Sequence, residues 1–313
     1  MRAVALAALA ALVPVSAAHA ETLRVCADPN NLPFSNAAEE GFENRVMTLI
    51  AQDLGVNVEF VWRAQRRGVV REALNAGLCD VIPGVASSLE MLATTAPWYR
   101  ASYMVVQRAG TVPVTGFDDP RLQSLRIGVQ LVGDDGANTP PAHALSRRGI
   151  IHNVRGFMVQ GPHDRPDPQR AIIDAVAAGM IDVAFVWGPV ADYYGRRAAT
   201  PLMLSPLPAS DGPQLPLRFD ISMGVRKGDL ALRRRLDAAI ERRAPAIAAL
   251  LRNDLPDARL PDASPEEADM AQKAGANQGG STKKGGDSSG GSDGGSTGTG
   301  RGGGKSGKAK GKG

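Results

Sequence analysis

The feature that most constrains the fold of this chain is the segment Leu23–Asn44, LRVCADPNNLPFSNAAEEGFEN. Apolar and other residues alternate over Leu23–Ala27, a pattern typical of a short strand. The residues Pro29–Asn31 then end the strand and leave Asp28 at its carboxyl end. In open α/β sheets, ligands bind at the carboxyl ends of the strands. The segment therefore predicts the first strand of an α/β fold, followed directly by candidate binding residues.

Beyond this segment, strand-like and helix-like stretches alternate over a core of about 240 residues. Such alternation is typical of parallel sheets flanked by helices, and the length suffices for two modest lobes. The predicted strands are Leu23–Ala27, Asn57–Trp62, Cys79–Pro83, Tyr103–Val106, Arg126–Gln130, Val154–Val159, Ile181–Trp187 and Phe219–Val225. The predicted helices are Phe42–Leu54, Val69–Ala76, one opening at Pro140–Leu145, Pro168–Ala178, and Leu230–Leu251 with a break near Pro245.

Four stretches carry a resemblance to a known family: CADPNNLPFSN, GFENR, RIGVQLVGDDGANTPPAHAL and FDISMGVRKGD. Over roughly residues 22–253 the chain resembles the type 2 periplasmic solute-binding proteins, and among them the MxaJ/XoxJ-type proteins associated with quinoprotein methanol dehydrogenases. The resemblance implies an α/β, bilobal type 2 periplasmic-binding-protein fold with two Rossmann-like lobes. Two hinge crossings, near residues 108–113 and 219–224, would join lobe 1 (residues 21–108 and 224–255) to lobe 2 (residues 113–220).

The two ends of the chain are predicted to lie outside the lobes. Residues 1–20 combine Arg2, an apolar run and Ala18-His19-Ala20, which is the pattern of a secretory signal peptide. The alternative is an uncleaved membrane anchor, for which the apolar run is short. Residues 262–313 are rich in Gly, Ser and Lys and are predicted to be disordered. We therefore expect a periplasmic protein that does not span the membrane.

The net charge differs between the tail and the lobes. The whole chain carries +4, whereas residues 277–313 hold seven Lys/Arg and two Asp, and Arg2 adds one more positive charge. Residues 21–276 therefore carry a net charge of −2. Because the basic character belongs to the tail, nucleic acid is not an implied partner of the folded part. The tail is either an electrostatic tether to an acidic partner or a solubilising extension.

Amino-acid receptors of the resembled superfamily hold their zwitterionic ligand with an Arg in one lobe and an acidic residue in the other. In the matching patterns, Met91 stands at the Arg position and Trp187 at the acidic position. The resemblance therefore predicts a cleft that lacks both charged anchors. The candidate residues for this ligand or partner cleft are Asp28, Asn30, Asn31, Phe34, Ser87, Ser88, Trp98, Tyr99, Gln130, Asp134, Asp135 and Trp187.

Several of these candidates have a second, structural interpretation. Asp28 is also suited to a turn, in which it hydrogen-bonds its own backbone around Pro29. Trp187 fits core packing as well as it fits a cleft or an interface. Asp134 and Asp135 lie between glycines and are a solvated turn first and a site second.

Cys26 and Cys79 are the only cysteines of the chain. Export to an oxidising compartment favours a disulfide between them. The strand register argues against it: with Asp28 beside Gly84, Cys26 would lie about three residues, or roughly 10 Å, from Cys79 along the sheet. That separation exceeds the reach of a disulfide. The sequence leaves the pairing open.

Catalysis and metal binding have little support in the sequence. His143, His152 and His163 lack metal-ligand spacing, and neither a Cys/His cluster nor a G-x-S-x-G elbow is present. We therefore expect no cofactor, no metal and no enzymatic activity. The resemblance implies an accessory or maturation partner of a periplasmic PQQ-dependent methanol (alcohol) dehydrogenase. The alternative is the substrate-binding receptor of an ABC transporter for a small solute other than a standard amino acid.

Overall fold

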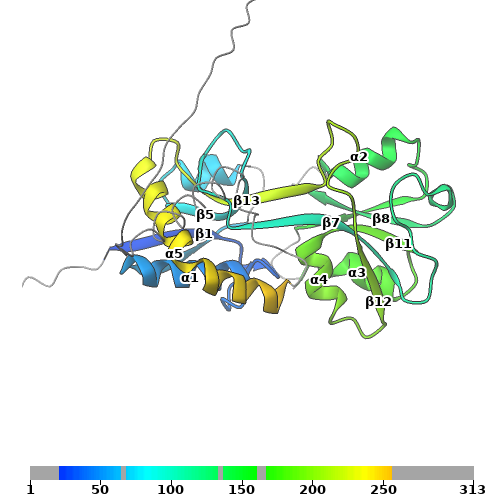
Figure 1. The fold of residues 1–313 in the computed structure, drawn as a ribbon, viewed down its shortest axis with the longest axis horizontal. Coiled ribbons are helices and arrows are strands. Elements are labelled where there is room, and N and C mark those ends of the chain that lie inside the picture. The colour runs from blue at the N-terminus through cyan, green and yellow to red at the C-terminus, as the bar shows by residue number, and fades with distance from the viewer. Residues whose placement is uncertain (1–20, 65–67, 133–136, 161–166, 256–313) are drawn as a thin grey trace, which may run out of the picture. The chain divides into compact units, whose positions relative to one another are not determined.

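The computed structural model describes residues 21–64, 68–132, 137–160 and 167–255. The predicted signal peptide (1–20) and the whole of the predicted tail (262–313) lie outside these residues, as do Asp134 and Asp135. Strands and helices alternate along the described chain, so the predicted α/β class is confirmed (Figure 1). None of the described helices is long and apolar enough to span a membrane.

The strands form one sheet whose main path runs β10-β8-β11-β7-β13-β5-β1-β4. β1, β4 and β5 are parallel to one another, and β8, β10 and β11 form a second parallel set. Antiparallel pairing through β7 and β13 connects the two sets. The bounds are β1 Thr22–Ala27, β4 Asn57–Trp62, β5 Val81–Ala86, β6 Ala93–Thr94, β7 Tyr99–Arg108, β8 Ile127–Val132, β9 Ala137–Asn138, β10 Val154–Met158, β11 Val183–Trp187, β12 Leu202–Pro206 and β13 Arg218–Val225, with β2 Asn30–Asn31 and β3 Ser35–Asn36 pairing separately.

β7 and β13, the two hinge strands, pass between the two parallel sets (Figure 1). β7 pairs with β13 through Ser102 and with β11 from Tyr103 onward. The change of partner therefore falls between Ser102 and Tyr103, earlier than the predicted first crossing at residues 108–113. Residues 103–108 were expected in lobe 1, but they pair with lobe 2 strands because the long strand β7 pairs with strands on both sides of the crossing. The second crossing, predicted at residues 219–224, lies within β13; the exact lobe limits stay a prediction.

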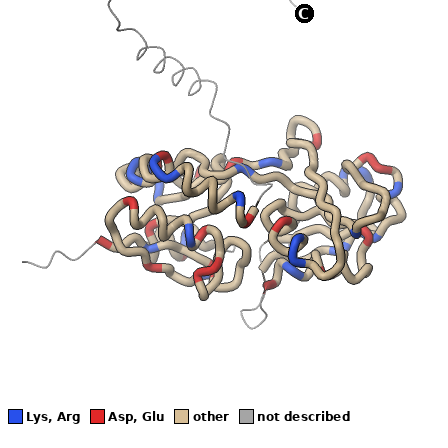
Figure 2. Tube along the Cα trace, turned by 60° about the horizontal axis from the view of Figure 1, so that its bottom comes forward, with Lys and Arg blue, Asp and Glu red and all other residues tan. Residues whose placement is uncertain are grey.

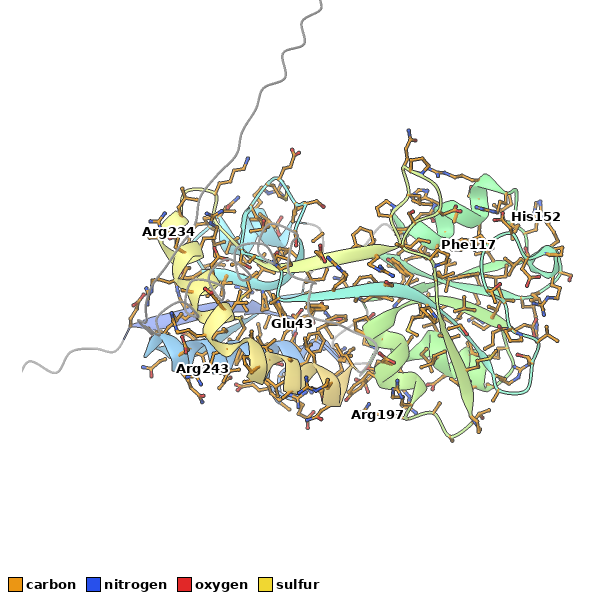
Figure 3. The ribbon with its side chains drawn as sticks, viewed as in Figure 1. Glu43, Phe117, His152, Arg197, Arg234 and Arg243 are labelled. Atoms are coloured by element: carbon orange, nitrogen blue, oxygen red, sulfur yellow. A yellow bond between two sulfur atoms is a disulfide. The ribbon has the colours of Figure 1, made fainter. Side chains whose placement is uncertain are left out.

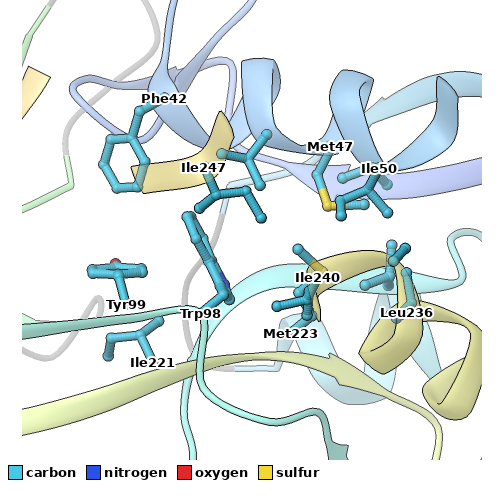
Figure 4. Close-up of a cluster of buried hydrophobic side chains, with 14 of the residues drawn as sticks. Phe42, Met47, Ile50, Trp98, Tyr99, Ile221, Met223, Leu236, Ile240 and Ile247 are labelled. Carbon is cyan, nitrogen blue, oxygen red and sulfur yellow. The ribbon is translucent and has the colours of Figure 1, made fainter. Parts of the chain in front are cut away.

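Helices α1 (Phe42–Leu54) and α5 (Leu230–Asp254) cover the first parallel set. Figure 4 shows their buried side chains meeting those of the hinge strands, with Phe42, Ile50 and Ile247 all fully buried. α1 ends as predicted, because Gly55 adopts the left-handed conformation at φ 67° that favours glycine. The predicted break near Pro245 is wrong: α5 continues through it, and the burial of residues beyond it offsets the lost hydrogen bond.

The second set carries α2 (Pro140–Arg147), α3 (Arg170–Ala177) and α4 (Gly188–Gly195). A π-helical turn, η1 (Val70–Leu74), replaces the predicted helix Val69–Ala76, and a 3-10 turn, η2 (Pro120–Gln123), precedes β8. Positions of Lys and Arg alternate with positions of Asp and Glu along the described chain (Figure 2). Many of these residues form ion pairs, such as Asp80 with Arg24 and Arg226.

Candidate functional site

A cavity of about 300 Å³ lies where the loop after β1 meets β8, α3 and the two hinge strands. Its polar lining consists largely of side-chain amides, and its apolar lining includes the four rings of Phe34, Tyr103, Trp187 and Phe219. None of the described residues that line it carries a charge. A volume near 300 Å³ stands at the lower end of the range for small-molecule sites.

Three side-chain amides form a continuous chain of hydrogen bonds across this cavity. The backbone N–H of Trp187 donates to Gln130 Oε1 at 2.7 Å. Gln130 Nε2 donates to Gln169 Oε1 at 3.1 Å, and Gln169 Nε2 donates to Asn31 Oδ1 at 2.7 Å. Because a backbone N–H can only donate, the first bond fixes the orientation of every amide that follows.

The same loop makes two further hydrogen bonds to the second lobe. The backbone N–H of Asp167 donates to Asn30 Oδ1 at 3.1 Å, and the Tyr194 hydroxyl donates to the carbonyl oxygen of Leu32 at 3.2 Å. Together with the amide chain, these bonds join the loop after β1 to residues around α3 and α4. The protein's own polar groups thus link the two lobes at the cavity.

Trp187 stands among the rings that wall the cavity. Its ring centroid lies 5.1 Å from that of Tyr103 and 6.0 Å from that of Phe219, both in edge-to-face geometry. Tyr103 is 8% exposed, and burial raises the pKa of its phenol. Its hydroxyl makes no hydrogen bond to the described residues, although it borders the cavity.

Four predicted site residues line the cavity: Asn31, Phe34, Gln130 and Trp187. Asn30 lies beside them and bonds the second lobe. Sequence reasoning missed Tyr103, Thr139, Gln169 and Phe219, which also line the cavity. Side chains alternate between the two faces of the hinge strands, and this alternation could have indicated Tyr103 and Phe219. No local sequence pattern indicated Gln169.

The other predicted site residues lie elsewhere. Trp98 and Tyr99 are core residues, 1% and 2% exposed, and the Trp98 indole N–H donates to the carbonyl oxygen of Pro83 at 2.9 Å. Ser87 bonds the hinge strand through the carbonyl oxygen of Asp220, and Ser88 is exposed. Asp28 is buried and accepts from the backbone N–H of Asn30 at 2.9 Å, as in its turn interpretation. The placement of Trp98 and Tyr99 in the cleft is therefore wrong, because their rings complete the core of the first lobe.

Cys26 and Cys79 are joined by a disulfide, with their Cα atoms 5.4 Å apart. The predicted register is right, since Val25 pairs with Val81 and this offset places Asp28 beside Gly84. The distance argument against the bond assumed that Cys79 lies in the strand. β5 begins only at Val81, so the chain at Cys79 is not extended along the sheet and the estimate of roughly 10 Å does not apply. Both cysteines are fully buried in a small apolar cluster.

Glu43 is a buried carboxyl in the first turn of α1 (Figure 3). It is 3% exposed, and a Cβ added at Gly84 would clash with its Oε1. No basic side chain of the described chain forms an ion pair with it, and burial raises its pKa to about 8. Burial, followed by the charge of Glu43, raises the pKa of Tyr99. Because the raised pKa of Glu43 lies above 7, its carboxyl is protonated at neutral pH.

We expect the variant Gln169→Leu to lose about 1–3 kcal/mol of unfolding free energy, because it leaves Gln130 Nε2 and Asn31 Oδ1 without their partners. It also removes the amide that joins the lobes, so the radius of gyration measured by small-angle scattering should rise. Gln123→Leu, at an exposed position of η2, is the matched control. Equal unfolding midpoints and radii for the two variants would contradict this role of Gln169.

Comparison with known proteins identifies the class of the chain. It belongs to the bacterial extracellular solute-binding proteins of family 3, whose model matches residues 23–245. No group of three or more His, Cys, Asp or Glu side chains in the described ranges could hold a metal ion.

Within this class, the chain is similar to particular proteins. Protein MoxJ of Methylorubrum extorquens AM1 is 33% identical over 249 residues, covering 75% of this chain and 81% of that protein. The periplasmic binding protein XoxJ from Methylobacterium extorquens AM1 aligns with a TM-score of 0.62 at 31% identity, covering 77% of this chain and 99% of that one. MxaJ from Methlophaga aminisulfidivorans MPT aligns with a TM-score of 0.64 at 24% identity, covering 76% and 100%. The predicted periplasmic-binding-protein fold and MxaJ/XoxJ-type resemblance are confirmed.

Proposed function

We propose that this protein is a non-catalytic periplasmic binding protein that serves as an accessory or maturation partner of a PQQ-dependent methanol (alcohol) dehydrogenase. The proposal joins the resemblance of its sequence to the MxaJ/XoxJ-type proteins with the chemistry of its cavity. Its similarity to MoxJ and XoxJ extends over most of the chain, which supports a shared role.

The observation that carries the proposal is that none of the described residues lining the cavity is charged. A receptor for amino acids must replace the water around an ammonium and a carboxylate with opposite charges, since burying an unpaired charge costs several kcal/mol. The described lining offers no such charge. Met91, at the position of the usual Arg, is 57% exposed and does not line the cavity, and Trp187 fills the other position with an indole ring.

Affinity purification of the tagged mature protein from its native periplasm, with mass spectrometry of what accompanies it, tests this function. We expect a quinoprotein dehydrogenase in near-equal amount. A tagged chain ending at residue 261 is the control for capture by the basic tail, because the lobes alone should retain the partner. Retention of the dehydrogenase by neither form would contradict the proposal.

A transport receptor for a small solute other than a standard amino acid is the second candidate. The amide and hydroxyl groups of the cavity favour it, since sites for small polar solutes place a few such groups among apolar walls. This role predicts a tightly bound small molecule, and no protein partner, in the same purification.

A further inference from the structure

We propose that the cavity between the amide chain and the aromatic residues is a binding site for an uncharged, flat carbonyl compound. This inference goes beyond the proposed partnership with a dehydrogenase, and the failure of either leaves the other standing. It follows from which hydrogen-bonding groups remain available at the cavity.

In the amide chain, every side-chain oxygen already accepts a hydrogen bond. Gln130, Gln169 and Asn31 each accept one hydrogen bond through the side-chain oxygen. The nitrogens of Gln130 and Gln169 each donate only one of their two protons in this chain, and the described residues offer Asn31 Nδ2 no acceptor. All three amides therefore keep unused N–H donors, and each amide oxygen also keeps its second lone pair.

The Tyr103 hydroxyl adds a further donor. The side chain is more than nine-tenths buried, lines the cavity and lacks a hydrogen-bond partner within the described chain. The hydroxyl oxygen is not among the fully buried side-chain atoms that lack a partner, so it is open to the cavity that Tyr103 lines. A ligand acceptor at this point would satisfy it.

The described residues that line the cavity favour a ligand without a net charge. An anion would meet the electron-rich faces of Tyr103, Trp187 and Phe219 without a cation among the described lining residues to pair with it. A cation would be attracted to the rings but would face the unused N–H groups, and the lining offers no carboxylate. A neutral carbonyl oxygen accepts from these donors without either cost, and a flat apolar body packs against the rings.

Three isosteric probes separate these possibilities: neutral benzamide, anionic benzoate and cationic benzamidine. In calorimetric titration of the mature protein, we expect saturable binding of benzamide below about 1 mM, a reasonable limit for so small a ligand. Benzoate and benzamidine should bind at least tenfold more weakly. Absence of benzamide binding, or equal or tighter binding of either charged probe, would overturn the assignment.

The variant Tyr103→Phe tests the assigned donor. It should weaken benzamide binding at least threefold while leaving the melting temperature of the free protein unchanged, because the hydroxyl has no partner to lose among the described residues. Tyr193→Phe, which alters the tyrosine stacked under Arg197 outside the cavity lining, is the matched control and should bind benzamide as the parent does. Unchanged affinity in Tyr103→Phe would remove Tyr103 from the site.

Discussion

Reduction of the Cys26–Cys79 disulfide should lower the unfolding free energy of this protein by about 4 kcal/mol. The two cysteines are 53 residues apart, and the chain-entropy model assigns about this value to a closed loop of that size. The whole first parallel set is affected, since the bond ties β1 to the segment that leads into β5. Urea unfolding with and without reductant, after thiol titration, measures the difference.

The variant Cys26→Ala/Cys79→Ala separates the bond from the reductant. It should unfold at the lower urea midpoint under both conditions, because it has no disulfide to reduce. Any further loss comes from the space left by two fully buried sulfur atoms. Identical midpoints for the oxidised and fully reduced parent would contradict a stabilising bond.

Glu43 should make the protein less stable as the pH rises from about 5 to 8. Its folded pKa is raised to about 8 from an ordinary value of 4.5, so folding requires it to take up a proton throughout that window. The unfolded state binds fewer protons there, and the stability falls by about 1.4 kcal/mol per pH unit from this group. This destabilisation is absent below pH 4.5, where Glu43 is protonated in both states, and it grows as the pH rises toward the folded pKa.

The variant Glu43→Gln removes this dependence. At pH 7 it should exceed the parent in unfolding free energy by about 3 kcal/mol, while the two converge near pH 4.5. Glu40→Gln, at an exposed position, is the control and should follow the parent at every pH. Parallel pH profiles for the parent and Glu43→Gln would show that Glu43 ionises normally.

The fold was largely predictable because its signals are local. The helix Phe42–Leu54 and the strand Asn57–Trp62 have the predicted bounds, since apolar periodicity and a terminal glycine define them. α4 and β12 were missed: α4 begins at Gly188-Pro189, which by itself indicates a turn. The disulfide was undecided because its geometry depends on where β5 begins, and strand ends are the least certain part of such a prediction.

The site was predictable only where it follows a strand end. Asn31 and Trp187 stand at strand ends, Gln130 lies two residues before the end of β8, and all three were expected. Gln169 comes from the start of α3, and its bond to Asn31 spans 138 residues of sequence. Trp98 was misplaced because its motif lies close to the hinge, and only tertiary packing shows that the indole points into the core.

The central claim is tested most directly by titrating the purified mature protein against a purified PQQ-free methanol dehydrogenase and detecting the complex by analytical ultracentrifugation. In parallel, calorimetry measures binding of glutamine and of arginine to the same protein. The account predicts a stoichiometric complex with the dehydrogenase and no heat of binding for either amino acid. Saturable binding of glutamine or arginine, with no complex at any dehydrogenase concentration, would contradict it and return the protein to the transport receptors.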